Sequence, residues 1–591
     1  MTRKQFLATL ACTRSVPAQA GPGGSVWAVH DGEKVEKDDL HNPLKTRNSA
    51  WDGRTIKLFA GRNEVVAFQV IVEASGAGIR NLRVSLPELK QRGGRGRLAY
   101  VPPSDDPSNS VGRPIQIFAE NYMYVPTPGT ASWIYRAGTP GAPPKPTGWK
   151  PVQLVPENAR AGRGGFPIQV APAGNQPIWI EIYTARDLPP GIYDGAVAVS
   201  ADNLTAKLPV TIEVFDFLLP DENSMHAMLY YDSSEPELYM GRNLDPEFHR
   251  FAHRHRVELV NAYSPVSAKE HAGRFRGDDF TRAQGYEGPG EGVGNRIMPM
   301  SFYGPPRGFE DRPTAWERSD AWMKFVTQNF PKALTFLYMP DEPSASSYGR
   351  INLIGENVHS NPGPGGKLPM FVTSGYQPRI ENAIDIWCSG PRGYNIARAI
   401  EERKKGRDYW FYNGGRPHGP AIAIESPATD PRAAIWACFK HDIRVYFYWH
   451  SVHWRHNSQK QGERNQDVWA NPITFDNRGQ PNKNSFGIGY GDGVLMYPGE
   501  EKVHPEQDRG IRGPCATIQL ANFRRGLQDH QYLTLARKLG LNTLVSETLQ
   551  AVVPKVFSDA GETVGFAENG DVYETARYKL AKAIAAAAHG Q

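Results

Sequence analysis

The chain has 591 residues, more than the roughly 250 to 300 that one hydrophobic core supports, so we expect at least two domains. Its 67 basic and 62 acidic residues leave a net charge of +5, and the basic residues are scattered, which argues against a nucleic-acid-binding surface. No apolar run approaches the roughly 20 residues that span a bilayer, so no transmembrane segment is predicted.

The N-terminus has features of an export signal. A basic start, an apolar stretch at residues 6–12 and small residues at 18–20 follow the order of a secretory leader, although Arg14 interrupts it. We therefore expect residues 1–24 to be a leader and the protein to be secreted or periplasmic, with cleavage before Cys12, as in lipoproteins, left open. The other cysteines follow no zinc-site or disulfide spacing and predict buried free thiols at Cys388, Cys438 and Cys515.

Residues 25–217 alternate short apolar runs with turns rich in Gly, Pro and Asn. Six such runs with no convincing helix predict an all-β domain of the sandwich type. The runs are 55–60 (TIKLFA), 65–73 (VVAFQVIVE), 115–125, 177–183, 196–200 and 208–215. Residues 126–175 begin as a Pro- and Gly-rich segment that is longer than a sandwich connection needs, and we expect it to fold over the neighbouring domain as a long loop.

From residue 225 to about residue 540 the pattern becomes strand, helix, strand. Eight candidate strands at this spacing predict a (β/α)8 barrel of the TIM type. The strands are 226–232, 257–263, 297–303, 334–339, 369–374, 383–388, 408–413 and 445–450, with helical patterns at 246–256, 313–330 and 431–441. A long helix at 515–539 follows, and the helical residues 541–591 are expected to pack on the barrel.

The barrel strand at 334–339 ends on two adjacent carboxylates, Asp341 and Glu342, followed by Pro343. Substrates bind at the carboxyl ends of barrel strands, because the loops that leave the strands form the crevice there. Neighbouring strand residues point to opposite faces, so the two carboxylates can share one cavity only if the strand ends before them, as Pro343 indicates. The plainer interpretation is a solvated turn.

Seven segments of the chain occur in the order seen in the DUF4091 family. They are GRNEVVAFQVIVEA, FLYMPDEPS, AIDIWCSG, DYWFYNGGRPHGP, IRVYFYWHSVHW, GDGVLMYPG and FRRGLQDHQYL. From about residue 25 to residue 539 the chain thus resembles these glycoside hydrolase-like proteins, which are similar to glycoside hydrolase family 123, the β-N-acetylgalactosaminidases. The resemblance implies a β-sandwich before a (β/α)8 barrel. It also implies substrate-assisted hydrolysis, in which Asp341 orients a 2-acetamido group and Glu342 is general acid and then base.

The spacing of the acidic pair fits this chemistry. Conventional carboxylate pairs flank a glycosidic bond from two sides, whereas adjacent residues address neighbouring points on one sugar face. A like-charged neighbour and partial burial would raise the pKa of Glu342, as a general acid requires. Two alternatives stay open. One is a glycosidase for another sugar, which would pair Glu342 with Asp232, Asp408 or Glu425; the other is a non-catalytic glycan-binding protein.

Aromatic side chains at the other strand ends are suited to binding sugars. Flat faces stack on sugar rings, and tyrosine hydroxyls contact sugar oxygens. About half of these residues are expected in the core instead, because alternate strand residues point to opposite faces. The candidate substrate-binding residues are Tyr231, Asp232, Tyr303, Trp387, Trp410, Tyr412, Tyr448, Trp449 and His450.

No metal or cofactor is predicted, and the expected partner is a glycan. One histidine group lies on an Arg-rich helix and is expected to form a solvated face: His249, His253 and His255. A second group lacks a nearby cysteine or carboxylate ligand: His450, His453 and His456. Asp492 and Arg524 could each reach the site or form a structural ion pair. The oligomeric state does not follow from the sequence.

Overall fold

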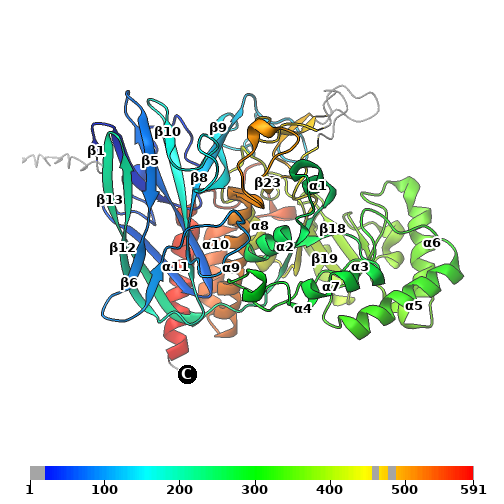
Figure 1. Ribbon diagram of the computed structural model, residues 1–591. Coiled ribbons are helices and arrows are strands. Elements are labelled where there is room, and N and C mark those ends of the chain that lie inside the picture. The colour runs from blue at the N-terminus through cyan, green and yellow to red at the C-terminus, as the bar shows by residue number, and fades with distance from the viewer. Residues whose placement is uncertain (1–19, 456–464, 477–486, 590–591) are drawn as a thin grey trace, which may run out of the picture.

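The computed structural model describes residues 20–455, 465–476 and 487–589 (Figure 1). A β-sandwich lies on one side of the molecule, a parallel sheet with its helices lies on the other, and long C-terminal helices lie between them (Figure 1). Most of the predicted leader, Cys12 and His456 fall outside the described residues, so export stays a prediction. No helix within the described ranges is long and apolar enough to cross a membrane.

Two sheets form the sandwich, and all six predicted runs lie in their strands. The first sheet is antiparallel, in the order β1 (Ala20–Gly21), β2 (Gly24–His30), β4 (Glu64–Ala74), β11 (Asn175–Thr184), β8 (Ile115–Val125), β9 (Gly148–Pro156), β24 (Pro514–Thr517) and β23 (Met496–Pro498). The second has the order β10 (Ile168–Val170), β5 (Ile79–Ser85), β12 (Gly191–Ala201), β13 (Leu204–Leu218) and β3 (Ile56–Arg62), with β6 (Glu88–Gln91) and β7 (Arg97–Ala99) at its side. Apolar side chains of both sheets share one core.

Two strands of the first sheet come from the far end of the chain. β24 pairs antiparallel with β9 and with β23, so the segment after the last parallel strand completes a sheet of the sandwich. The sequence pattern did not predict that β23 and β24 belong to the sandwich, because these strands are only three and four residues long.

The second half of the chain forms a parallel sheet of seven strands. Their order is β15 (Glu258–Val260), β14 (His226–Tyr230), β20 (Val445–Tyr448), β19 (Asp408–Tyr412), β18 (Ile386–Ser389), β17 (Met370–Val372) and β16 (Leu337–Tyr338). The first of these strands in the chain, β14, pairs with the last, β20. The predicted third strand is reduced to one bridge between Ile297 and Leu334. The mixed multidomain fold is confirmed, and a closed eight-stranded barrel stays a prediction.

The α-helices lie around the parallel sheet or, for the long C-terminal ones, between it and the sandwich (Figure 1). They are α1 (Ser234–Met240), α2 (Asp245–Arg254), α3 (Pro265–Glu270), α4 (Ala272–Arg276), α5 (Arg312–Asn329), α6 (Tyr348–His359), α7 (Ile396–Lys404), α8 (Asp430–Lys440), α9 (Ile518–Lys538), α10 (Asn542–Val552) and α11 (Gly570–His589). Asp311 starts α5 by accepting a hydrogen bond from the Thr314 N–H. α11 packs on α9 and α10 and also on β13 and β3, so it contacts the sandwich as well as the helices near the parallel sheet.

The histidines of α2 are not on a solvated face, and that prediction is wrong. His249 is 4% exposed, and the ring of His253 stacks on Phe280 with centroids 3.7 Å apart. The reason is that α2 packs on both β15 and β24, so the parallel sheet and the sandwich cover it from two sides. The prediction of buried free thiols is confirmed for Cys388, Cys438 and Cys515.

A buried charge network joins the sandwich to α8, α9 and α11. Arg525 of α9 lies 2.7 Å from Asp31, 3.3 Å from Glu64 and 2.8 Å from Glu574. The complete network consists of Asp31, Glu64, Arg432, Arg525, Asp529, Glu574 and Arg577. Its neighbour Arg524 pairs with Glu181 of β11, so it is a structural residue and does not reach the cavity described below.

Candidate active site

A cavity of about 890 Å³ lies at the carboxyl ends of strands β16 to β20. This is the edge at which parallel sheets with crossover helices form their binding crevices. The wall consists of residues 341–343 after β16, 373–375 after β17, 389–393 at the end of β18, 412–416 and 418 at the end of β19, 449–450 after β20, and Ser132, Trp133, Tyr303, Phe475 and Asp492 from other segments.

Asp341 is held by two hydroxyl groups. Its Oδ1 accepts hydrogen bonds from the Tyr338 hydroxyl at 2.8 Å and from Thr373 Oγ1 at 2.7 Å. The same Thr373 oxygen accepts the Glu342 N–H at 2.9 Å, which ties the loop after β16 to the end of β17. Because both hydroxyl bonds go to Oδ1, the other carboxylate oxygen of Asp341 is left to contact a ligand.

Glu342 has a left-handed backbone, with φ at 41°. Tyr303 and Asn413, at φ 53° and 54°, share this uncommon conformation, and all three residues line the cavity. Such strain concentrates at functional sites. β16 ends at Tyr338, before the acidic pair, so strand alternation no longer separates Asp341 from Glu342 and both side chains reach one cavity.

The Glu342 carboxylate makes no hydrogen bond to the described part of the chain. Its surface is open to the cavity, yet the cavity walls remove much of the surrounding water. This burial, together with the charge of Asp341, raises the pKa of Glu342 above its usual value. The pair therefore consists of one carboxylate fixed by hydroxyl groups and one carboxyl group that is free to exchange a proton.

Asp492, another residue of the cavity wall, accepts hydrogen bonds from three aromatic side chains. Its Oδ1 accepts the Tyr448 hydroxyl at 2.8 Å and Trp449 Nε1 at 3.0 Å, and its Oδ2 accepts Trp133 Nε1 at 3.0 Å. Asp492 is 6% exposed, and burial raises its pKa although the three hydrogen bonds oppose this rise. Trp133 belongs to the Pro- and Gly-rich segment 126–175, so the expectation that this segment reaches the neighbouring domain is confirmed for the part around Trp133. The expectation of one long loop is wrong for the rest of the segment, which contains the sandwich strands β9 and β10.

Asn413 and His450 offer hydrogen-bond donors to the cavity. Asn413 Oδ1 accepts the Trp449 N–H at 2.8 Å, which leaves its Nδ2 group as a donor. His450 Nδ1 accepts the N–H groups of Ser451 and Val452, so its proton lies on Nε2. Burial lowers the pKa of His450 well below its usual value, which keeps the ring neutral.

The predicted site residues divide into two groups. Those that line the cavity are Asp341, Glu342, Tyr303, Tyr412, Trp449 and His450. Those that lie outside it are Tyr231, Asp232, Trp387, Trp410 and Tyr448. Trp387 packs against Tyr376 on the face of β18 opposite to Cys388, because alternate strand residues point to opposite faces. Trp410 points to the same inner face as Tyr412, but it lies one pair of residues earlier in β19 and is buried in the core below the cavity. Tyr448 lies behind the wall, where it donates to Asp492.

None of the alternative acids lies in the cavity. Asp408 is at the start of β19, the opposite end from the crevice, and Glu425 is buried, where it accepts the Tyr135 hydroxyl at 2.9 Å. Asp232 accepts the Ser234 N–H outside the cavity. The sequence analysis missed Trp133, Tyr338, Thr373 and Asn413. The available signal for Trp133 was a tryptophan within a Pro- and Gly-rich segment, although Trp149 of the same segment gives the same signal and lies outside the cavity.

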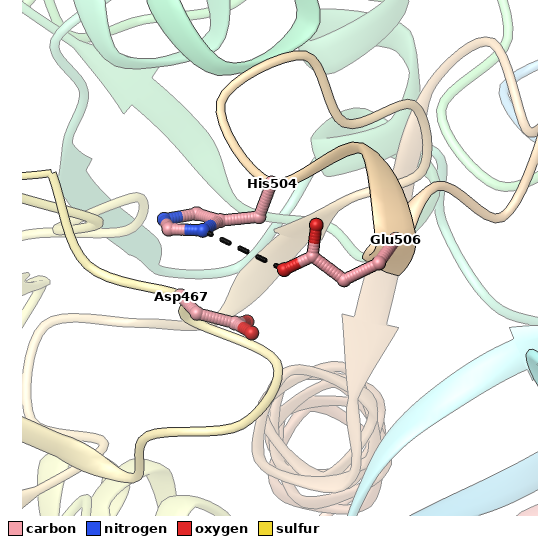
Figure 2. A group of neighbouring side chains, drawn as sticks. All are labelled: Asp467, His504 and Glu506. Atoms are coloured by element: carbon pink, nitrogen blue, oxygen red, sulfur yellow. Dashed lines mark ion pairs between the residues drawn. The ribbon is translucent and has the colours of Figure 1, made fainter.

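One group of side chains among the described residues could hold a metal ion: Asp467, His504 and Glu506 (Figure 2). None of the three lines the cavity. Protein groups already bond to most of their ligand atoms. Asp467 accepts three hydrogen bonds, His504 Nε2 lies 3.0 Å from the Asn465 carbonyl oxygen, and His504 Nδ1 lies 3.8 Å from Glu506. These contacts account for the group without an ion, and we assign no metal to it.

No protein-family model matches the chain, and no curated protein matches it in sequence. Among solved structures, a family 123 glycoside hydrolase from Clostridium perfringens, studied for glycolipid glycan hydrolysis, is similar with a TM-score of 0.61 and 11% identity. The match covers 95% of this chain and 98% of that chain. The two proteins share a fold. The DUF4091 resemblance itself stays a prediction.

Two further solved structures are much less similar. Bacteroides uniformis β-glucuronidase 3 has a TM-score of 0.26 and 8% identity, over 80% of this chain and 50% of that chain. A chitinase active domain from Pyrococcus furiosus has a TM-score of 0.24 and 11% identity, over 52% of this chain and 97% of that chain. Neither adds to the argument.

Proposed function

We propose that this protein is a glycoside hydrolase that cleaves a β-linked 2-acetamido sugar, such as an N-acetylgalactosaminide, with retention of configuration. The observation that carries the proposal is the acidic pair: Asp341 and Glu342 share one cavity, the first fixed by two hydroxyl groups and the second free with a raised pKa. The shared fold with a family 123 glycoside hydrolase supports it.

In this reaction the free oxygen of Asp341 accepts the N–H of the acetamido group and turns its carbonyl oxygen toward C1. Glu342 gives its proton to the glycosidic oxygen, the C1–O bond breaks, and the carbonyl oxygen bonds to C1 to form a cyclic oxazolinium ion. Water then attacks C1 while Glu342 takes a proton from it, and the ring opens to restore the acetamido group. Two displacements at C1 give retention.

A conventional pair of carboxylates on opposite sides of the bond is less well supported. Among the described residues the other acid in the cavity wall is Asp492, and its two oxygens already accept three hydrogen bonds. These bonds and its 6% exposure make Asp492 a poor nucleophile and a poor base for a water molecule.

The test is a panel of aryl β-glycosides with and without a 2-acetamido group. We expect the wild-type protein to hydrolyse only the acetamido sugars and to be inhibited by the corresponding thiazoline, a mimic of the cyclic intermediate. Hydrolysis of sugars that lack the acetamido group at equal rates would rule out the substrate-assisted mechanism. Glycan binding without any hydrolysis would favour a binding protein.

Thr373 should be needed to orient Asp341. Thr373→Val removes the hydroxyl that donates to Asp341 and accepts the Glu342 N–H, so we expect kcat/KM on the acetamido substrate to fall by about 10- to 100-fold. Thr373→Ser keeps the hydroxyl and should stay within about 3-fold of wild type. Steady-state kinetics of both variants check this, and equal losses in the two would contradict it.

The pH profile should report the raised pKa of Glu342. The proton on Glu342 is needed for the first step, so kcat/KM falls as pH rises through this pKa. Asp341→Asn removes the neighbouring negative charge, which lowers the pKa of Glu342 and moves the falling limb to lower pH. Both proteins are compared on one substrate whose leaving group needs protonation, with enough enzyme to follow the residual activity of the variant, and an unmoved limb would contradict the assignment.

A further inference from the structure

The segment that carries Trp133 is docked firmly at the edge of the cavity. The N–H groups of Thr130 and Ala131 both donate to the Ile488 carbonyl oxygen, at 2.9 and 3.0 Å, and Thr130 Oγ1 accepts the Ile488 N–H at 3.0 Å. The Tyr135 hydroxyl accepts the Gly129 N–H at 2.6 Å and donates to Glu425. These hydrogen bonds hold residues 129–135 in place at the wall of the cavity.

One carboxylate sets the position of two indole rings from different parts of the chain. Trp133 and Trp449 donate to different oxygens of Asp492, each at 3.0 Å, so their separation follows from the position of this carboxylate. The Trp449 ring also packs against the backbone of Gly493, where a Cβ atom would lie 2.7 Å from the ring. The Trp133 ring contacts the Phe475 ring edge to face, with ring centroids 4.8 Å apart.

Trp449 links this wall to the acidic pair. The Trp449 carbonyl oxygen accepts a hydrogen bond from the Tyr303 hydroxyl, and the Trp449 N–H donates to Asn413. Tyr303 and Asn413 are the two residues that share the left-handed backbone of Glu342 and line the cavity with it. Trp133 and Trp449 line the same cavity as the acidic pair. A sugar chain that places its reacting ring at the acidic pair can therefore contact these two indole rings with its other rings.

We infer that Asp492 is a positioning residue that fixes Trp133 and Trp449 as a wall for stacking sugar rings, so that the sandwich supplies part of the substrate-binding surface. The inference rests on the proposed function. The apolar face of a pyranose ring is the ligand chemistry that two indole faces recognise. Asp492 acts through the two rings and does not touch the reacting atoms.

A double-mutant cycle tests the Asp492–Trp133 contact. Trp133→Phe keeps an aromatic face but removes the N–H donor, whereas Asp492→Asn keeps one acceptor for Tyr448 and Trp449 and replaces the acceptor for Trp133 with an amide group. We expect each variant to raise KM for the 2-acetamido aryl glycoside by about 5- to 30-fold with kcat within about 3-fold. The double variant should resemble either single variant, because the same bond is lost.

Two further variants separate stacking from folding. Trp133→Ala removes the aromatic face and should raise KM beyond Trp133→Phe, again with little change in kcat. Trp149→Phe, on β9 outside the cavity, is the matched control and should leave KM unchanged. Thermal melts of all variants identify losses that come from unfolding. Additive effects in the cycle, or equal falls in kcat and kcat/KM, would overturn the inference.

The failure of this inference differs from the failure of the proposed function. If the wild type hydrolyses the substrate and KM is unchanged in the variants, the stacking role of Trp133 and Trp449 is contradicted and the proposed hydrolase activity stands. If the wild type cleaves nothing, binding of the same aryl glycoside is measured by calorimetry. Weaker binding by Trp133→Ala than by the wild type would support the stacking role without hydrolase activity. No binding by the wild type would contradict both proposals.

Discussion

Glu342→Gln is expected to lower kcat for an N-acetylated aryl β-glycoside with a poor leaving group by about 10²- to 10⁴-fold, the range that general acid catalysis contributes. The amide cannot give a proton to the glycosidic oxygen. A substrate whose leaving group needs no protonation should lose much less in the first step, so the deficit should shrink as the leaving group becomes more acidic. Rates across a series of substituted phenyl glycosides measure this dependence.

The control for this variant is Glu356→Gln. Glu356 lies on α6, is largely exposed and pairs with Arg312, and it does not line the cavity. It should retain wild-type kinetics. A loss at Glu342 that is the same for every leaving group would mean that the residue positions the substrate and does not supply the proton.

Arg525→Met should cause a large loss of stability, although the residue lies outside the cavity. Arg525 is 2% exposed and contacts Asp31, Glu64 and Glu574, which belong to the sandwich and to α11. Burial alone would raise the pKa of Glu574, but Arg525 and Arg432 lower it to about 2. Without Arg525 the acids lose a cation that water cannot replace, so we expect the free energy of unfolding to fall by about 3 to 5 kcal/mol.

Urea denaturation measures this change, and the same helix offers a control. Arg537 is also on α9, but it is half exposed and lies 3.0 Å from the exposed Asp442. Exposed pairs contribute about 0 to 1 kcal/mol, so Arg537→Met should be close to wild type. A similar small loss for Arg525→Met would show that the network adds specificity of packing and little net stability.

The sequence was informative where a residue's role follows from its position along one strand. Period-two runs predicted the sandwich strands, and the order of strand, acid, acid, proline predicted that Asp341 and Glu342 share a cavity. Both arguments use local geometry, which the chain carries within about ten residues.

The remaining features depend on contacts between distant segments. Trp387 and Trp410 look like Trp449 in sequence. The face of the strand separates Trp387 from the cavity, and the depth along the strand separates Trp410 from it. Asp492 and Trp133 are 359 positions apart, so no spacing rule connects them. The buried charges of α9 resemble a solvated helix face until the sandwich and α11 are placed against it.

The pairing of β24 with β9 joins the two halves of the molecule through one sheet. A fragment that ends with β13 would leave β9 as a bare edge strand, open to pairing with other chains, and would aggregate. A fragment that begins with β14 would lack the partner of β24 and the wall residue Trp133. Recombination that removed the sandwich would therefore also remove part of the cavity wall and the partner strand of β24.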